Sequence, residues 1–428
     1  MRTATRVILL PAFFMGLRIF AAGNELSEQQ VVREALAANP ALKASAAKWA
    51  AMKERVPQAR AWEDPMTGVK LERFGTTSFS RYTDSEWMVS QTVPLSGKNL
   101  SRGRAAEAEA RAAYEDVRRV RLDVLAKTRA TYFRLCNAYA QLALNRKNQG
   151  LLVQFVEISK AKYEVGGRSQ ADVLAAQTDA SKLEQERFRL EQDLSAQQSA
   201  LNVLMNRPAT APLGDPAALA FKPLTRKASD LEALILAHRP EVVAAQRNIA
   251  AEEARLQLAH RQWIPDPQVQ VAARHPRESG DAFTEYDTAV YFSVPWANPG
   301  KYSAGVREAT QSVESARRNL EAAKTDALGL LRDRLRMISS LAQQYQLSQE
   351  KIVPLAAHTV ETLQAGYRTD ISNYLEVISA QRTLREAEAA ASTQLADYLA
   401  ALAELDALVG LDGETGDGKT AAARNSTR

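Results

Sequence analysis

The feature that most constrains this chain is an internal duplication, in which the second half repeats the first at an offset of about 200 residues. The matched segments are 36–40 with 236–240, 64–65 with 266–267, 91–98 with 292–301, and 199–206 with 403–410. Because the offset stays nearly constant, the two halves should be equivalent structural units. We expect the first unit to span 24–213 and the second to span 229–411.

Each half predicts the same order of elements. A helix of about 35 residues precedes two strands, a helix of more than about 60 residues, a short break and a helix of almost 40 residues. The breaks fall at 166–169 and 369–372. After each break, apolar residues recur with a period near 3.5, which indicates coiled-coil seams. The seams include Leu183, Leu190 and Leu201 in the first half, and Leu384, Tyr398 and Leu405 in the second.

The strand candidates alternate apolar and polar residues. They lie at 69–72, 87–93, 267–274 and 286–294. A length of about 8 to 10 residues suits a tilted strand that spans a membrane. Polar stretches at 73–86 and 275–285 would be the hairpin loops.

Within the last strand candidate, Val290 and Phe292 alternate with polar neighbours, and we expect both to face lipid. Four strands cannot close a barrel, and open strand edges are not tolerated in lipid. The chain should therefore form a closed barrel together with the strands of other copies of itself. The alternative is a soluble sheet packed on helices.

The helix expected from about 99 to 165 would extend on the order of 100 Å. A helix of this length cannot fold into a globule. We therefore expect it to be one of several helices that form the wall of a long cylinder.

The N-terminus has a basic start, an apolar run at 7–20 and small residues at 21–23, which predicts an export signal at 1–23. A short N-terminal membrane anchor is the alternative. The net charge of +5 comes from mixed basic and acidic residues rather than a basic stripe, so no nucleic acid partner is expected.

Residues 413–420, GETGDGKT, match the phosphate-binding loop of nucleotide hydrolases. Such a loop needs a buried strand before it and a helix after it. Here a coiled-coil helix is expected before the motif and only eight residues follow it. We therefore interpret the motif as part of a disordered tail at 412–428.

No other motif suggests catalysis, and we expect no enzyme activity, no cofactor and no metal site. Cys136 is the only cysteine and should be a buried apolar side chain. The histidines share no metal-ligand spacing; they are His238, His260, His275 and His358.

Three motifs and their duplicated counterparts resemble one family. They are the ALAANP opening at 35–40, the VPLSGK turn at 93–98, and the Y-x-V-G-x-x-S-x-x-D-V-L-x-A-Q break at 163–177. The chain is identified from them as a member of the outer-membrane factors, the TolC-like outer membrane efflux proteins. The PLSGK form and the modest length are similar to the heavy-metal efflux branch.

The resemblance implies a mainly α fold with a small β part. Long antiparallel coiled-coil helices would form a periplasmic tunnel, and four strands per chain would join a twelve-stranded barrel in the outer membrane. It also implies a homotrimer, contact with outer-membrane lipid, a periplasmic adaptor (membrane fusion) protein and, through it, an inner-membrane pump. The implied function is a passive exit duct of a tripartite efflux pump or type I secretion system, for small toxic molecules or metal ions.

The alternative function is a periplasmic coiled-coil adaptor or scaffold without a channel. That class would have one helical hairpin and a lipoyl-like β domain instead of two equivalent repeats.

By position in the family, Asp172 and Glu376 would line the tunnel entrance. Ser379 stands where better-known members carry a further acidic residue. The tips that meet the adaptor would hold Gly166, Gly167, Arg168 and Asp370. The alternative is that all of these are only turn and helix-capping residues.

Overall fold

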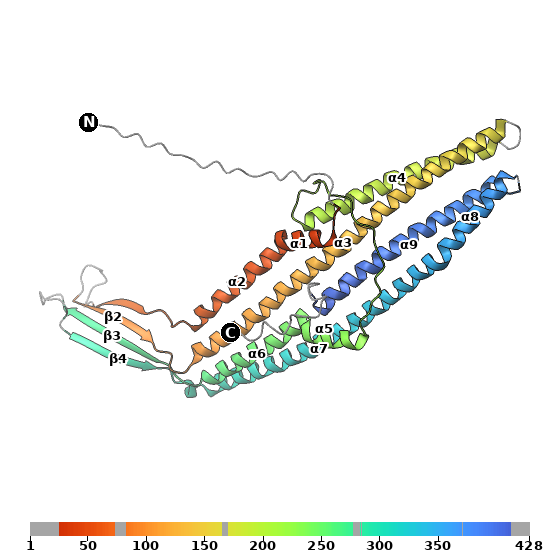
Figure 1. Ribbon diagram of the computed structural model, residues 1–428. Coiled ribbons are helices and arrows are strands. Elements are labelled where there is room, and N and C mark those ends of the chain that lie inside the picture. The colour runs from red at the N-terminus through yellow and green to blue at the C-terminus, as the bar shows by residue number, and fades with distance from the viewer. Residues whose placement is uncertain are drawn as a thin grey trace, which may run out of the picture.

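The computed structural model describes residues 25–72, 83–164, 170–276, 283, 285–369 and 371–411. The molecule is elongated, with a four-stranded sheet at one end and two helical hairpins at the other (Figure 1). The first half contains α1 (Glu28–Ala38), α2 (Pro40–Arg60), β1 (Met66–Glu72), β2 (Asp84–Thr92), α3 (Lys98–Glu164) and α4 (Gln170–Leu204).

The second half repeats this order. It contains α5 (Ala228–His238), α6 (Pro240–Arg261), β3 (Pro267–Pro276), β4 (Glu285–Phe292), α7 (Pro299–Leu347), α8 (Val353–Arg368) and α9 (Tyr374–Val409). Two short turns complete it, the 3-10 turn η1 (Pro295–Ala297) and the π-helical turn η2 (Ser348–Ile352). The duplicated, mainly helical fold class is thus confirmed.

The prediction of one continuous helix at the start of each half was wrong, because a proline breaks it. Proline disfavours helical geometry in the residue before it, and Asn39 and Arg239 both leave the helix with ψ near 124°. Asn39 closes α1 with its backbone N–H and begins α2, where its side chain accepts from the amides of Ala41 and Leu42 at 3.0 and 3.4 Å.

The expected long helix of the first half is present as α3, which has 67 residues and therefore extends about 100 Å. Its counterpart runs from α7 into α8 through the π-helical turn. A proline in a helix clashes with the carbonyl four residues earlier, and Pro354 lies two residues after the end of this widened turn. Ser348 in the turn donates to the side-chain amide oxygen of Gln394 on α9 at 2.8 Å.

The core lies along the seams between the long helices. The seam residues named from the sequence are buried, apart from Leu384, which is half-buried. Leu135 of α3, Leu201 of α4 and Leu331 of α7 are completely buried. Cys136 is buried as predicted, and burial raises the pKa of its thiol to about 11.

The sheet is antiparallel with the order β1-β2-β3-β4, so β1 and β4 form its two edges. The central pair joins the two halves of the chain, with Val89 opposite Val271. β1, β2 and β3 are longer than predicted, because 66–68 belongs to β1, and 84–86 belongs to β2 and 275–276 to β3 rather than to hairpin loops. β4 is shorter than predicted, because it ends at Phe292 rather than at 294. In the described part of the chain, no helix is both long enough and apolar enough to cross a membrane.

Candidate functional site

The strand register sorts the sheet into two chemically different faces. Residues directly opposite in an antiparallel pair share a face. One face, here named the apolar face, carries Val69, Leu71, Trp87, Val89, Val269, Val271, Ala273, Tyr286, Val290 and Phe292. Val290 and Phe292 are 51% and 59% exposed in the single chain, and both lie on this face.

The opposite face, named the polar face, holds the ion pairs of the sheet. Lys70 lies 3.1 Å from Glu72 and 3.4 Å from Glu86, and Arg274 lies 3.1 Å from Glu72 and 3.6 Å from Glu285. These ion pairs connect side chains from all four strands on the same face of the sheet. The sheet can therefore present hydrocarbon on one face and an aqueous, charged surface on the other.

A half-buried acid joins the sheet to the long helix α3. Asp266, between α6 and β3, accepts from the backbone amide of Ser96 at 2.7 Å, from its hydroxyl at 2.8 Å, and from the ammonium of Lys98 at 3.0 Å. Burial alone would raise the pKa of Asp266, but the Ser96 and Lys98 hydrogen bonds outweigh it and lower the pKa.

The turn at this junction requires glycine. Gly97 has φ of +73°, and a Cβ there would meet the guanidinium of Arg261. That guanidinium donates to the carbonyl of Ser96 at 2.7 Å. The direction of α3 relative to the sheet is therefore fixed by side chains from both halves of the chain.

At the far helical end, opposite the sheet, an aromatic cluster ties the two hairpins together. Tyr367 of α8 and Tyr374 of α9 are each 1% exposed. Phe155 of α3 lies between them, with ring centroids 5.5 Å from Tyr367 and 6.5 Å from Tyr374. Sequence analysis missed this cluster, although Tyr374 stands next to a predicted break.

The predicted entrance residues both lie in the first turn of a helix at this end. Asp172 is half-buried in α4. Burial is the largest cause that raises the pKa of Tyr374, followed by Asp179 and Tyr367, and the charge of Asp172 adds a smaller contribution. Glu376 is exposed in α9.

Glu376 forms a capping box with Asn373. Its carboxylate accepts from the Asn373 amide at 3.1 Å, and its own amide donates to the Asn373 side chain at 2.9 Å. Glu376 therefore has the capping role that the sequence left open as the alternative. Ser379 is exposed one turn further along α9.

The predicted tip residues Gly166, Gly167, Arg168 and Asp370 lie outside the described residues, as do 1–23 and the tail at 412–428. The segment before the GETGDGKT motif is described, and it is the end of α9, closed by Gly410 in the left-handed conformation. A coiled-coil helix rather than a buried strand thus precedes the motif, as predicted.

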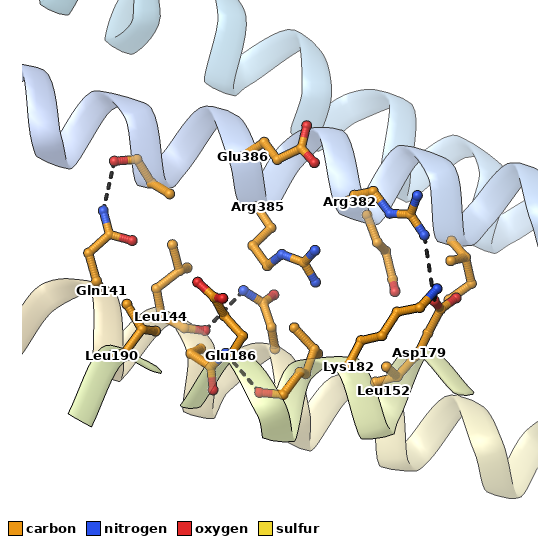
Figure 2. Close-up of a pocket in the computed structure, with 16 residues that line it drawn as sticks. Gln141, Leu144, Leu152, Asp179, Lys182, Glu186, Leu190, Arg382, Arg385 and Glu386 are labelled. Atoms are coloured by element: carbon orange, nitrogen blue, oxygen red, sulfur yellow. Dashed lines mark hydrogen bonds and ion pairs between the residues drawn. The ribbon is translucent and has the colours of Figure 1, made fainter. Parts of the chain in front are cut away.

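A groove of about 470 Å³ lies between α9 and the α3–α4 hairpin, near the far helical end (Figure 2). Arg382 of α9 reaches Asp179 of α4 at 3.5 Å, and Arg385 extends toward the same hairpin in Figure 2. Basic and acidic side chains balance along it; they are Lys182, Arg382, Arg385, Asp179, Glu186 and Glu386. This balance suits adhesion between the halves better than recognition of a charged ligand.

Among the described residues, no group of three or more His, Cys, Asp or Glu side chains is placed to hold a metal ion.

The geometry of a two-faced sheet on long paired helices agrees with comparisons to known proteins. The family model described as "Outer membrane efflux protein" matches residues 31–207 and 232–411, so the chain belongs to this family. Membership confirms the predicted family, the efflux function and the outer-membrane location. It decides against the adaptor alternative.

Among relatives, the chain is 24% identical over 327 residues to the toluene efflux pump outer membrane protein TtgF of Pseudomonas putida, covering 74% of this chain and 67% of that protein. It is 21% identical over 366 residues to the cobalt-zinc-cadmium resistance protein CzcC of Cupriavidus metallidurans, covering 86% and 85%. Its fold is similar to the Campylobacter jejuni CmeC outer membrane channel, with a TM-score of 0.76, 17% identity, and coverage of 90% of this chain and 85% of that one.

Proposed function

We propose that this protein is a passive exit duct that works as a homotrimer. The four-stranded sheets of three copies would close a twelve-stranded barrel, with the apolar face toward lipid and the polar face toward the lumen. The long helices would continue this lumen as a tunnel through the periplasm. The sheet is the observation that carries the proposal. Its two faces differ in polarity, and its edge strands β1 and β4 have no partner strand on their outer sides within the described chain. The sheet lies at one end of very long helices (Figure 1).

The duct would perform no chemistry and would need no cofactor. Its energy would come from an inner-membrane pump, reached through a periplasmic adaptor that docks at the helical tips around 166–168 and 370. The relatives named for toluene and for cobalt, zinc and cadmium support small toxic molecules or metal ions as the exported class. Any choice between them would be made upstream in the pump.

Two substitutions on adjacent residues of β4 test the membrane orientation. Val290→Arg places a charge on the apolar face and should cost about 2 to 4 kcal/mol near the bilayer midplane. Tyr291→Arg, the matched control, places the same charge on the polar face and should be tolerated. The outer-membrane level of each variant is the measurement. Equal levels for the two variants would contradict the proposed orientation.

We also propose that Asp172 and Glu376 line the periplasmic entrance. Both carboxylates belong to the first turn of a helix at the far helical end, in matching places of the two repeats. In a trimer they would form a ring of negative charge, which attracts cations and repels anions. The capping box does not conflict with this role, because Glu376 caps with one carboxylate oxygen while its side chain remains exposed.

The entrance role is separable from the capping role. Glu376→Gln keeps an oxygen that can accept from the Asn373 amide, but it removes the charge. Asp172→Asn combined with Glu376→Gln should therefore lower cation preference in planar-bilayer conductance without unfolding the helix. Asn373→Ala, the control, breaks the cap and retains both charges, so it should leave selectivity unchanged. Unaltered selectivity in a double variant shown to be trimeric would mean that these residues only cap helices.

A further inference from the structure

A pocket of about 320 Å³ lies against the middle of α3, where α6 begins and α9 ends, and α7 completes its wall. Five basic and three acidic side chains line it; they are Arg119, Lys127, Arg134, Arg239 and Arg334, with Asp123, Glu241 and Glu404. Five positive charges less three negative charges leave the pocket with an excess of two positive charges.

The excess charge can be located, because each acid of the pocket already has a basic partner. The pairs are Asp123 with Arg119 at 3.4 Å, Glu241 with Arg239 at 3.1 Å, and Glu404 with Arg334. Lys127 and Arg134 are exposed, and neither forms an ion pair with any residue that the structure describes. They lie on one face of α3, about 10 Å apart along its axis, so both long side chains can reach one group between them.

The start of α6 adds positive potential to the same pocket. Arg239 is the N-cap residue of α6 and makes no side-chain capping hydrogen bond. A helix N-terminus favours negative charge, so a guanidinium there is unfavourable unless an anion lies close to it. The Arg239 side chain is only 13% exposed, and its Nη1 atom is shielded from solvent without an acceptor in the described part of the chain. An oxyanion in the pocket would add an acceptor beside this guanidinium.

Comparison of the two repeats shows that the helical framework does not require these cations. The counterpart of Arg239 is Asn39, a neutral residue whose side chain caps α2. The Gly-Lys pairs at the start of α3 and α7 align the two helices, and they place Leu330 and Met337 at the positions of the two unpaired cations. Both are exposed apolar side chains. The basic set therefore belongs to one repeat only, which indicates a local role in binding.

We propose that this pocket binds a divalent oxyanion of the phosphate type, either as the free ion or as the phosphoryl group of a larger molecule. Lys127 and Arg134 are its direct ligands, and their two charges match those of the ligand. A guanidinium can also donate two parallel hydrogen bonds to such a group. A water molecule takes up about 30 Å³, so the pocket has room for an oxyanion and several waters. All of these residues belong to one chain, so the site does not depend on the proposed trimer.

Isothermal titration calorimetry of the intact, detergent-solubilised protein tests this site. The buffer contains neither phosphate nor sulfate, and the probes are inorganic phosphate and phenyl phosphate. Lys127→Gln and Arg134→Gln should each weaken binding about tenfold, because each removes one charged donor. The matched control is Arg146→Gln, which removes an exposed cation of α3 outside the pocket and should leave the affinity unchanged.

A gain of affinity separates a binding role from a structural one. Glu404→Gln releases Arg334 from its ion pair and raises the excess from two positive charges to three, so it should strengthen binding severalfold. Binding should also depend on pH, because a phosphate monoester loses one negative charge below about pH 6. The affinity for phenyl phosphate should therefore fall between about pH 7.5 and about pH 5.5, whereas the affinity for sulfate should not.

The two probes distinguish the sources of the ligand. Binding of both probes supports a site that accepts the free ion, and binding of phenyl phosphate alone supports a site for a phosphoryl group on a larger molecule. Absence of binding for both probes would overturn the assignment. So would an unchanged affinity in the double variant Lys127→Gln with Arg134→Gln, once its helical circular dichroism signal shows that it is folded.

Discussion

The half-buried pair of Asp266 and Lys98 at the junction should be unusually strong for an ion pair in this protein. The perturbation is a double-mutant cycle of Asp266→Asn and Lys98→Met. The carboxylate accepts three hydrogen bonds from Ser96 and Lys98, and the two ionic side chains are 12% and 15% exposed.

The expected energies follow from this geometry. Exposed ion pairs contribute about 0.2 to 1 kcal/mol, whereas charge-assisted hydrogen bonds with little solvent contribute more. We expect a coupling energy of about 1.5 kcal/mol between the two residues. Asp266→Asn alone should cost about 2 kcal/mol, because Lys98 loses its charged acceptor while one oxygen remains for the Ser96 amide.

The same pair predicts a pH dependence with a definite sign. The folded-state pKa of Asp266 is lowered from its ordinary value of 3.8. The stabilisation is therefore present above about pH 3.8 and is lost as the pH falls through the lower folded-state pKa. In the Asp266→Asn variant, the free energy of unfolding should not show this decrease at low pH.

The assay is urea unfolding of the detergent-solubilised protein at fixed concentration, followed by the helical circular dichroism signal. The matched control is the exposed pair Arg318 and Glu321, whose side chains are 70% and 66% exposed. Its coupling energy should be negligible beside that of the Asp266 and Lys98 pair, because solvent screens both exposed side chains. A coupling for Lys98 and Asp266 no larger than that of the control would refute the reasoning.

Three further outcomes are expected. Leu201→Ala should destabilise the fold by about 2 to 5 kcal/mol in the same urea assay, since Leu201 is completely buried, and a cost below 1 kcal/mol would count against the core described above. Gly97→Ala should cost about 1 to 2 kcal/mol from the left-handed backbone alone, visible as a lower melting temperature, and an unchanged temperature would contradict it. Truncation after Leu411 should leave export intact in a drug and metal susceptibility assay, and ATP binding that disappears with Lys419→Ala would overturn the interpretation of the tail.

Much of the fold was predictable because its signals are local and repeated. The heptad seams and alternating strands depend on spacing along one segment, and the duplication supplied each signal twice. The breaks before Pro40 and Pro240 were missed, although proline disfavours helical geometry in the residue before it, and the Asn39-Pro40 step also offers an N-cap. The π-helical turn at Ser348–Ile352 was not predictable, because it depends on how α7, α8 and α9 share one seam.

The candidate site was predictable only in part. The capping box of Asn373 and Glu376 follows from their spacing in sequence. The pairing of β2 with β3, and the contact of Asp266 with Lys98, join residues 168 or more positions apart, and no local pattern specifies them. The two faces of the sheet required that register, because a shift of one residue exchanges every side chain between faces.

The most direct test of the central claim is native mass spectrometry of the unmodified protein, extracted in mild detergent from the outer-membrane fraction. A passive duct of this family, closed by strands from several copies, should be recovered as a trimer in that fraction. The trimer should dissociate into monomers only after heating in denaturant. A monomer recovered from the soluble periplasmic fraction would contradict the account.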